Sequence, residues 1–266
     1  MPRTTRHGAL QHSLRHRVRS VSVGRPLHWL ARGWADFSRH PLPGLLHGAV
    51  LAILGGALFV LARHAFWLLA GAFSGFLLVA PVLATGLYAL SRAQDRGEPA
   101  TLATALRTWY PHDGRLVLFG VLLALAGTGW VLTSAALITG FAPMPVHNPH
   151  DFLRHVVLAE RGVLFEAWLL LGALLAAPVF ASSVVAIPML LDTRIGVLGA
   201  VLTSWRVVMQ NPVPMALWAL LLAGITALAM LPALLGLLVA VPWLAHASWH
   251  AWHDLVESAD AQGPAR

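Results

Sequence analysis

The sequence predicts an all-α integral membrane protein with six transmembrane helices in three quasi-repeated hairpins. Hydrophobic residues make up 58% of the 266 residues, and charged residues only 11%. Soluble domains carry roughly 25% charged residues, so this chain has too little charge to cover a surface exposed to water. A Trp also follows a Leu by seven residues ahead of three apolar stretches, in the pairs Leu27/Trp34, Leu102/Trp109 and Leu198/Trp205. Such an internal repeat indicates one structural unit used three times.

Five long apolar stretches separate the polar segments: 45–62, 66–90, 116–138, 163–191 and 213–247. A membrane-spanning helix needs about 20 residues, so each of the first four stretches predicts one helix. The last stretch is too long for a hydrocarbon core of roughly 30 Å at 1.5 Å per residue. Because Pro232 lies near its middle, we expect two short spans joined by a turn near 230–234. Five spans with one kinked final helix is the alternative.

The repeat organises a polytopic membrane domain at residues 21–257, with repeats at about 21–97, 98–191 and 192–257. A short amphipathic helix should precede each hairpin and lie in the membrane interface, because it is too short to span. In the first repeat, its apolar face consists of Leu27, Leu30, Trp34 and Phe37. The polar tails at 1–20 and 258–266 lack periodicity and are predicted to be disordered.

The arginines predict the orientation. All eighteen basic residues are Arg, and six spans place fifteen on the side of the N-terminus and only Arg63, Arg154 and Arg161 on the other. Positive residues gather on the cytoplasmic side, so both termini and all three amphipathic helices are expected there. The N-terminal arginines also favour anionic lipid headgroups. No basic domain with interleaved aromatic residues is present, so nucleic-acid binding is not expected.

A histidine cluster near the end of the last apolar stretch is the strongest candidate site. His246, His250 and His253 share one face of the predicted helix, and Asp254 follows His250 by one turn. Imidazoles in that arrangement bind transition metals or ligate a haem. Yet histidine is common throughout the chain, and the neighbouring Trp residues suit a helix end at the membrane interface. We therefore assign no metal, cofactor or catalytic residue, and keep these three histidines as speculative metal ligands.

Other polar residues are weaker candidates. His147, His150, Asp151 and His155 have helical spacing in the expected external insertion 139–162, where Asn148-Pro149 predicts the start of a short helix. Ser182 and Ser183 precede Pro188, where a hydroxyl most often satisfies backbone groups freed by the ring. Apart from Glu166, the apolar stretches contain no Asp, Glu, Arg or Lys, which argues against a proton-coupled pump. The absence of Cys excludes thiolate metal sites.

Three stretches carry a family resemblance: Val23-Gly-Arg-Pro-Leu-His-Trp-Leu-Ala-Arg-Gly-Trp, Gly86-Leu-Tyr-Ala-Leu-Ser-Arg and His246-Ala-Ser-Trp-His-Ala-Trp-His-Asp-Leu-Val. From about Val21 to Val256 the chain resembles a bacterial family of integral membrane proteins known as a domain of unknown function (family 2189). The resemblance implies a location in the bacterial inner membrane and no established activity. Some members carry a cytochrome c oxidase subunit I label. We do not extend that label to this chain, which has no His in the core of a span to ligate a binuclear centre.

These observations favour a non-enzymatic inner-membrane protein that acts as a scaffold, assembly or regulatory factor with a membrane-protein partner. The buried spans offer no catalytic constellation, and polar residues concentrate on the cytoplasmic amphipathic helices. Two alternatives remain. One is a haem- or metal-binding accessory of a respiratory complex that uses His246 and His250. The other is a transporter of a neutral or lipidic substrate, indicated by repeated hairpins whose second helices contain Pro.

Overall fold

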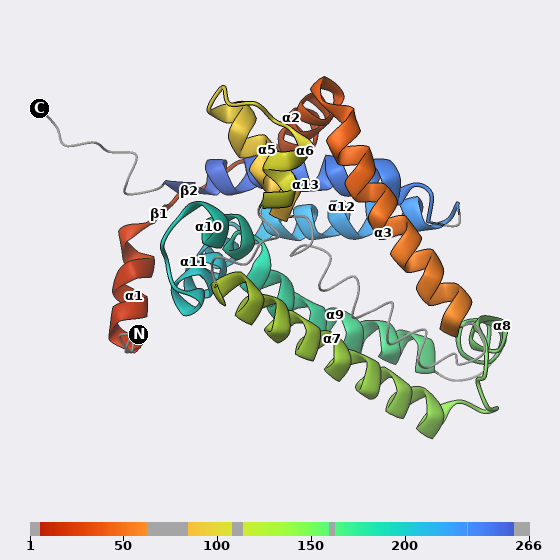
Figure 1. Ribbon diagram of the computed structural model, residues 1–266. Helices are drawn as coiled ribbons and strands as arrows, with labels where there is room; N and C mark the ends of the chain where they lie inside the picture. Colours follow the sequence, from red (N-terminus) through yellow and green to blue (C-terminus); the bar gives the residue numbers. More distant parts are fainter. Residues whose placement is uncertain (1–5, 63–84, 108–113, 160–162, 233, 258–266) are drawn as a thin grey trace, which may run out of the picture. The chain divides into compact units, whose positions relative to one another are not determined.

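The computed structural model describes residues 6–62, 85–107, 114–159, 163–232 and 234–257, and these are mostly helical (Figure 1). The all-α prediction is therefore confirmed, apart from one pair of two-residue strands. The helices are α1 (Arg6–Arg15), α2 (Arg25–Arg39), α3 (Pro41–Ala62), α5 (Thr85–Asp95), α6 (Leu102–Arg107), α7 (Gly114–Phe141), α8 (Pro149–Phe152), the π-helix η1 (Leu153–Val157), α9 (Leu164–Ser183), α10 (Ala186–Asp192), α11 (Val197–Gln210), α12 (Pro212–Met230) and α13 (Leu237–Leu255). Strand β1 (Arg17–Val18) pairs antiparallel with β2 (Val256–Glu257).

The chain divides into two compact units. The first unit contains the N-terminal segment through Ala52, α5, α6, the start of α7, and everything from Phe180 onward. The second unit contains the rest of α7, α8, η1, most of α9 and the last residues of α3.

Three described helices are long and apolar enough to cross a membrane: α7, the continuous pair Leu164–Asp192 and α12. A fourth span is counted if α2 and the start of α3, which are bent by 103°, are taken as one. The protein is therefore a membrane protein with helices able to span the bilayer. Six spans are not confirmed. Most of the predicted span at 66–90 lies outside the described residues, and α13 is not among the candidate spans.

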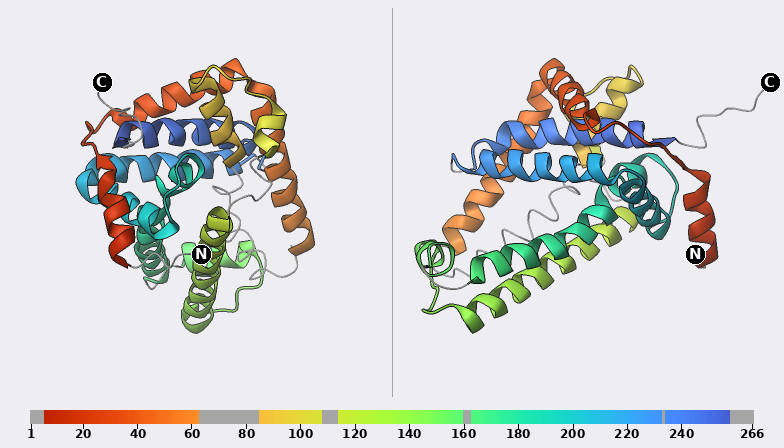
Figure 2. Two further views of the ribbon diagram at one scale, coloured as in Figure 1. Left: turned by 60° about the vertical axis from the view of Figure 1, so that its left-hand side comes forward. Right: turned by 180° about the vertical axis from the view of Figure 1, so that it is seen from behind.

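The last apolar stretch breaks where the sequence predicts it. Helix α12 ends at Met230 and α13 begins at Leu237. Leu234 in the connection has a φ of 68°, in the left-handed region, where a chain typically leaves a helix. The turn is tight, because a Cβ on Gly236 would lie 2.5 Å from the carbonyl oxygen of Ala229. Figure 2 shows α12 and α13 lying side by side as a result.

The core of the first unit lies between α2 and α13 (Figure 1). Helix α2 buries Trp29, Leu30, Gly33 and Phe37, and α13 buries twelve of its residues, including Trp249 and Trp252. The backbones come very close, because a Cβ on Gly33 would lie 2.5 Å from the backbone nitrogen of Ala247. Small residues permit this approach, and the larger aromatic side chains fill the space on either side.

Within the segment 1–20, predicted to be a disordered tail, the structure has the helix α1 and the strand β1. Helix α1 packs against α11, where Arg206 Nη1 donates to the carbonyl oxygen of Ser13 at 2.7 Å. Val18 then pairs with Val256 at the other end of the chain. Both contacts join residues far apart in the sequence, so local composition gave no sign of them. The predicted tail at 258–266 lies outside the described residues.

Two of the three predicted amphipathic helices are long helices ahead of an apolar helix: α2 precedes α3, and α11 precedes α12. The third is represented by the six-residue α6, and Trp109 lies outside the described residues. The apolar face predicted for α2 is divided. Leu30 and Phe37 are buried, whereas Leu27 and Trp34 are 56% and 47% exposed. The three-hairpin repeat layout is therefore not confirmed.

Gly33→Ala should destabilise the first unit, because the added methyl group would overlap the backbone of Ala247. Backbone atoms, unlike a side chain, cannot relieve this overlap by rotating about a bond. We expect a loss of about 1–3 kcal/mol, as for other overpacked sites, measured as a lower melting temperature in mild detergent. Gly24→Ala is the matched control, since no atom lies within 4 Å of the position of its added Cβ. Equal melting temperatures for the two variants would contradict the close helix approach.

Candidate functional site

The predicted histidine face meets a carboxylate that the sequence did not indicate. His250 lies on the buried side of α13 and is 2% exposed. Its Nε2–H donates to Asp36 Oδ2 on α2 at 2.6 Å. Asp36 is also buried, and Arg39 Nη1 lies 3.8 Å from its other oxygen. The contact joins residues 214 positions apart, and it ties the first amphipathic helix to the end of the last apolar stretch.

His246 makes a separate contact one turn earlier. Its Nδ1 lies 2.5 Å from Ser91 Oγ on α5, and both side chains are buried. Burial lowers the pKa of His246 to about 4, against the opposing effect of Asp36. The imidazole is therefore neutral near pH 7, and its tautomer decides whether Nδ1 or the Ser91 hydroxyl is the donor. This hydrogen bond joins α13 to α5 in the same way that the His250 contact joins α13 to α2.

Asp254 forms a third contact between α13 and α2. Its Oδ2 accepts from Arg25 Nε at 2.6 Å and from Trp29 Nε1 at 2.7 Å. Partial burial raises the pKa of Asp254, but the bonds from Arg25 and Trp29 outweigh it, and the pKa is lower than usual. We use the name α13 polar cluster for Asp36, Ser91, His246, His250 and Asp254.

Indole donors extend the same connections. Trp249 Nε1 donates to Asp95 Oδ2 on α5 at 2.7 Å, and Trp243 Nε1 donates to the carbonyl oxygen of Leu30 on α2 at 2.7 Å. An indole has an N–H donor and no acceptor. Each of these Trp side chains therefore fills core volume while its single polar atom fixes the position of a neighbouring helix.

The three predicted histidines do not converge. His253 is exposed, and its Nδ1–H donates to the carbonyl oxygen of Trp249 at 3.2 Å, with its ring 4.2 Å from the Trp252 ring. His246 and His250 have separate partners on α5 and α2. Within the part of the chain that the structure describes, no three His, Asp or Glu side chains are placed to hold one metal ion.

Catalysis by the α13 polar cluster is disfavoured by its geometry. A nucleophilic serine needs one imidazole that contacts both the serine and an orienting carboxylate. Here Ser91 bonds to His246, whereas Asp36 bonds to His250. The Ser91 side chain is also fully buried. The arrangement instead holds three helices in one register, because a buried polar group is costly in any packing that separates it from its partner.

The sequence contains one signal for Asp36 that periodicity alone did not identify. Asp36 is the only acidic residue of α2, and it follows Trp29 by seven residues and Gly33 by three. That spacing places it on the buried face, between apolar residues. An acidic side chain in such a position requires a buried partner, and α13 contains His residues at helical spacing.

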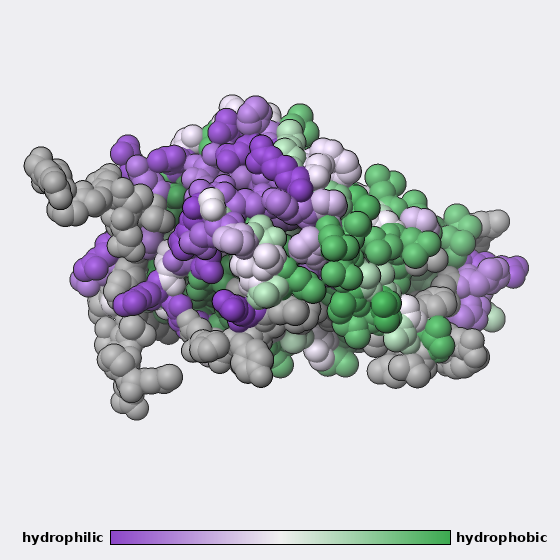
Figure 3. Space-filling model, turned by 45° about the horizontal axis from the view of Figure 1, so that its top comes forward, coloured by the Kyte–Doolittle hydropathy of each residue, from purple (hydrophilic) through white to green (hydrophobic). Residues whose placement is uncertain are grey.

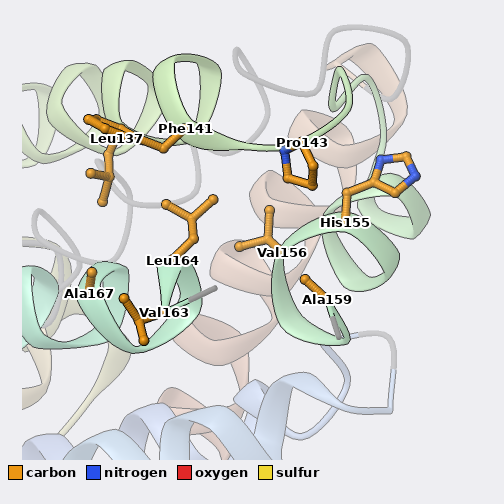
Figure 4. Close-up of a pocket in the computed structure, with 9 residues that line it drawn as sticks. All are labelled: Leu137, Phe141, Pro143, His155, Val156, Ala159, Val163, Leu164 and Ala167. Carbon is orange, nitrogen blue, oxygen red and sulfur yellow. The ribbon is translucent and has the colours of Figure 1, made fainter. Parts of the chain in front are cut away.

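The predicted histidine cluster at residues 147–155, in the second unit, contains a helix N-cap followed by a π-helix. Asn148 Oδ1 accepts from the Asp151 backbone nitrogen at 2.9 Å, so the predicted helix start is confirmed. The backbone N–H of His147 and the Asn148 amide donate to Asp151 Oδ2, and the His147 bond lowers the pKa of Asp151 most. His155 lies on η1, close enough to Asp151 to contribute to the lower pKa of that carboxyl, and lines a cavity (Figure 4).

The two serines near Pro188 make hydrogen bonds, but these two bonds are not to the backbone carbonyl four residues before Pro188. Ser182 Oγ accepts from Trp205 Nε1 at 2.9 Å, and the Ser183 hydroxyl donates to the carbonyl oxygen of Phe180 at 3.4 Å. Trp205 is one of the three Trp residues of the sequence repeat. Its hydrogen bond to Ser182 holds its indole ring in place. Neither serine is hydrogen-bonded to an imidazole or a carboxylate in these contacts.

The apolar helices define the class of the protein, which is an integral membrane protein. Residues 68–192 match the model of a family described as "Predicted integral membrane protein (DUF2189)". The chain is thus similar to that family over its middle part, which includes Gly86–Arg92 but not the other two stretches that carry the resemblance. No cytochrome c oxidase assignment is confirmed. No curated protein and no solved structure matches the chain significantly.

The Asp36–His250 contact should show energetic coupling. We expect Asp36→Ala or His250→Ala to destabilise the protein by roughly 3–5 kcal/mol, the cost of leaving one member of a buried pair without its partner. The double variant should lose less than the sum, because it removes both polar groups. Melting in mild detergent, followed by tryptophan fluorescence, measures all three. Additive losses would contradict a direct interaction.

Asp254 should contribute stability that depends on pH. Its carboxylate is favoured in the folded state, so this contribution is complete at neutral pH and is lost as the pH falls below about 4. We expect the folded protein to melt at a higher temperature than Asp254→Asn at pH 7, with a gap that narrows in acid. A gap of constant size across this range would show that the carboxylate charge is not involved.

Proposed function

We propose that the protein is a non-enzymatic scaffold, assembly or regulatory factor of the bacterial inner membrane, with both termini in the cytoplasm. The observation that carries this proposal is the construction of α2. One face of this helix packs against α13 and is hydrogen-bonded to it. The rest of its surface is exposed, with apolar side chains on one side and basic side chains on the other. Such a helix is a fixed surface to which another membrane component can bind.

The buried face of α2 is held along its whole length. Arg25 and Trp29 bond to Asp254 near its start, and Asp36 bonds to His250 near its end. The carbonyl oxygen of Leu30 accepts from Trp243 between them. A helix attached at three points along its length presents its exposed side chains in a constant arrangement, which reduces the entropy lost when a partner binds.

The exposed faces separate apolar from basic side chains. At 100° per residue, Leu27 and Trp34 lie on one side of the buried face, whereas His28, Arg32 and Arg39 lie on the other. Figure 3 shows hydrophilic and hydrophobic side chains gathered in separate regions of the surface. A helix with an apolar stripe beside a basic stripe suits the interface of a bilayer that contains anionic lipids.

The bend between α2 and α3 supports the same arrangement. The two helices are bent by 103° at His40, so α2 lies along the membrane surface if α3 enters the bilayer. Leu27 and Trp34 would then face the lipid interface, and the arginines would face the headgroups. The positive-inside tendency of the arginines supports the cytoplasmic side for this surface.

The proposal is tested by purifying the full-length tagged protein from its native host in gentle detergent and identifying proteins that remain bound. We expect a membrane-protein partner with the wild-type chain and its loss with the double variant Leu27→Ser/Arg32→Glu, which changes both exposed stripes. Arg107→Glu is the charge-matched control, because Arg107 is an exposed arginine on α6. A wild-type protein that purifies alone, or equal recovery of the partner by all three proteins, would overturn the proposal.

The alternatives have less support. A haem- or metal-binding accessory would need His246 and His250, which already bond to Ser91 and Asp36. One observation favours it: His250 Nδ1 is buried with no hydrogen-bond partner among the described residues, while its Nε2 bonds to a carboxylate, as in many metal-bound histidines. The absorption spectrum and metal content of the same purified sample distinguish this role. No described contact favours a transport path in particular.

A further inference from the structure

Helix α1 packs along α11, and the two helices run in the same direction. Ala9 lies opposite Gly199, because a Cβ on Gly199 would be 3.4 Å from the carbonyl oxygen of Ala9. One turn further along both helices, Ser13 Oγ lies 3.0 Å from Thr203 Oγ1. The contacts advance together along the two helices, which therefore form a parallel pair.

Each helix of this pair leaves an apolar side exposed. On α1, Leu10 and Leu14 each follow a contact residue by one position, and both are exposed. On α11, Leu198 precedes a contact residue by one position. Trp205 and Met209 continue the same side of α11 seven and eleven residues later. All three are exposed, Met209 by 75%.

The two apolar sides face the same way. A residue one position after a contact residue lies about 100° clockwise around its helix, and a residue one position before lies about 100° anticlockwise. Because the helices are parallel and face each other, these opposite rotations turn both sets of side chains toward one side of the pair. We use the name α1–α11 surface for the apolar surface that results, which consists of Leu10, Leu14, Leu198, Trp205 and Met209.

The α1–α11 surface lies at the ends of two candidate spans. Helix α11 ends at Gln210, and the candidate span α12 begins at Pro212. Trp205 Nε1 donates to Ser182 Oγ, and Ser182 is in the last turn of α9, whose 20 residues have the length of one bilayer crossing. Trp side chains are also enriched at membrane interfaces. If α9 and α12 cross the bilayer, lipid is present beside this surface and covers it without any additional partner.

The charges around the α1–α11 surface suit lipid headgroups. Neither helix contains an acidic residue. Arg15 and Arg17 are exposed near the end of α1, and Arg194 is exposed shortly before α11. Arginine side chains beside an apolar surface reach the headgroup phosphates while the apolar side chains enter the boundary of the hydrocarbon. An apolar centre with basic margins is the pattern of helices that lie in a membrane surface.

We propose that the α1–α11 surface lies in the bilayer interface and binds lipid directly, which makes α1 a membrane-bound helix. This inference goes beyond the proposed function, because it involves no partner protein and no side chain of α2. It also has a consequence for the end of the chain. Strand β1 follows α1 and pairs with β2, so the docking of α1 holds residues 256–257 near the same membrane surface.

The test uses nitroxide labels, because a chain without Cys accepts a single label at a chosen position. The full-length variants Leu14→Cys and Met209→Cys are labelled and placed in nanodiscs of phosphatidylethanolamine and phosphatidylglycerol, whose two faces are both open to water. Electron paramagnetic resonance then measures collisions with oxygen, which concentrates in lipid, and with a water-soluble nickel chelate. We expect the ratio of oxygen to nickel collisions to be several times higher for both variants than for a label in water.

Arg15→Cys is the matched control. Arg15 is exposed on the same helix, and it lies about 100° and 140° around that helix from Leu14 and Leu10. Its label should collide mainly with the nickel chelate, because it points away from the α1–α11 surface. Melting temperatures show whether each labelled variant is folded, and Leu10→Cys replaces Leu14→Cys if that variant fails.

Three outcomes would overturn the proposal. Equal collision ratios for Leu14→Cys and Arg15→Cys would show that α1 has no lipid-facing side. A high ratio for Met209→Cys together with a low one for Leu14→Cys would show that α11 contacts lipid without α1. Few collisions with either reagent at both positions would show that protein covers the surface, from a second copy of the chain.

Discussion

The rest of the first unit depends on the hydrogen bond between Asp36 and His250. A carboxylate on the buried face of a helix is unfavourable unless a partner lies opposite it, and only one register of α2 on α13 places His250 there. Once this register is set, Gly33 lies against Ala247, and Trp29 reaches Asp254. The direction in which α3 leaves the end of α2 is then determined as well.

Such pairs contribute more to the choice of packing than to net stability. Removing two polar groups from water costs about as much as their attraction returns. Apolar side chains of similar size would bury the same surface and would tolerate a shift of one turn. The α13 polar cluster does not tolerate it, because Asp36 would lose its partner on α13 and Asp254 would lose its partner Trp29 on α2. A surface helix that must present the same side chains to a partner benefits from this restriction.

Local signals in the sequence predicted the features that depend on local physics. The C-terminal end of α2, the break after Met230 and the Asn148 cap follow from Pro placement, span length and capping chemistry. The sequence did not predict α1 and β1, whose partners on α11 and β2 lie some two hundred residues away. It identified the histidines of α13 but not Asp36, because the periodicity of one helix carries no information about a contact between two helices.

Helix α13 shows that the polar residues of an apolar helix carry information about what surrounds it. A helix that faces lipid and a helix that is buried among other helices both need apolar side chains, so mean hydropathy does not distinguish them. Their polar residues do. In a lipid-facing helix, Ser and Thr bond to the carbonyl of the preceding turn, as Thr128 and Thr133 of α7 do. In α13, His246 and His250 bond to residues on other helices, which requires those helices to pack against it.

The two Trp residues of α2 differ in the same way. Trp34 is exposed, whereas Trp29, on the buried face of the helix, is hydrogen-bonded to α13. The period of the polar residues along a helix, together with the presence of complementary residues elsewhere in the chain, is therefore a better guide to its surroundings than its apolar content.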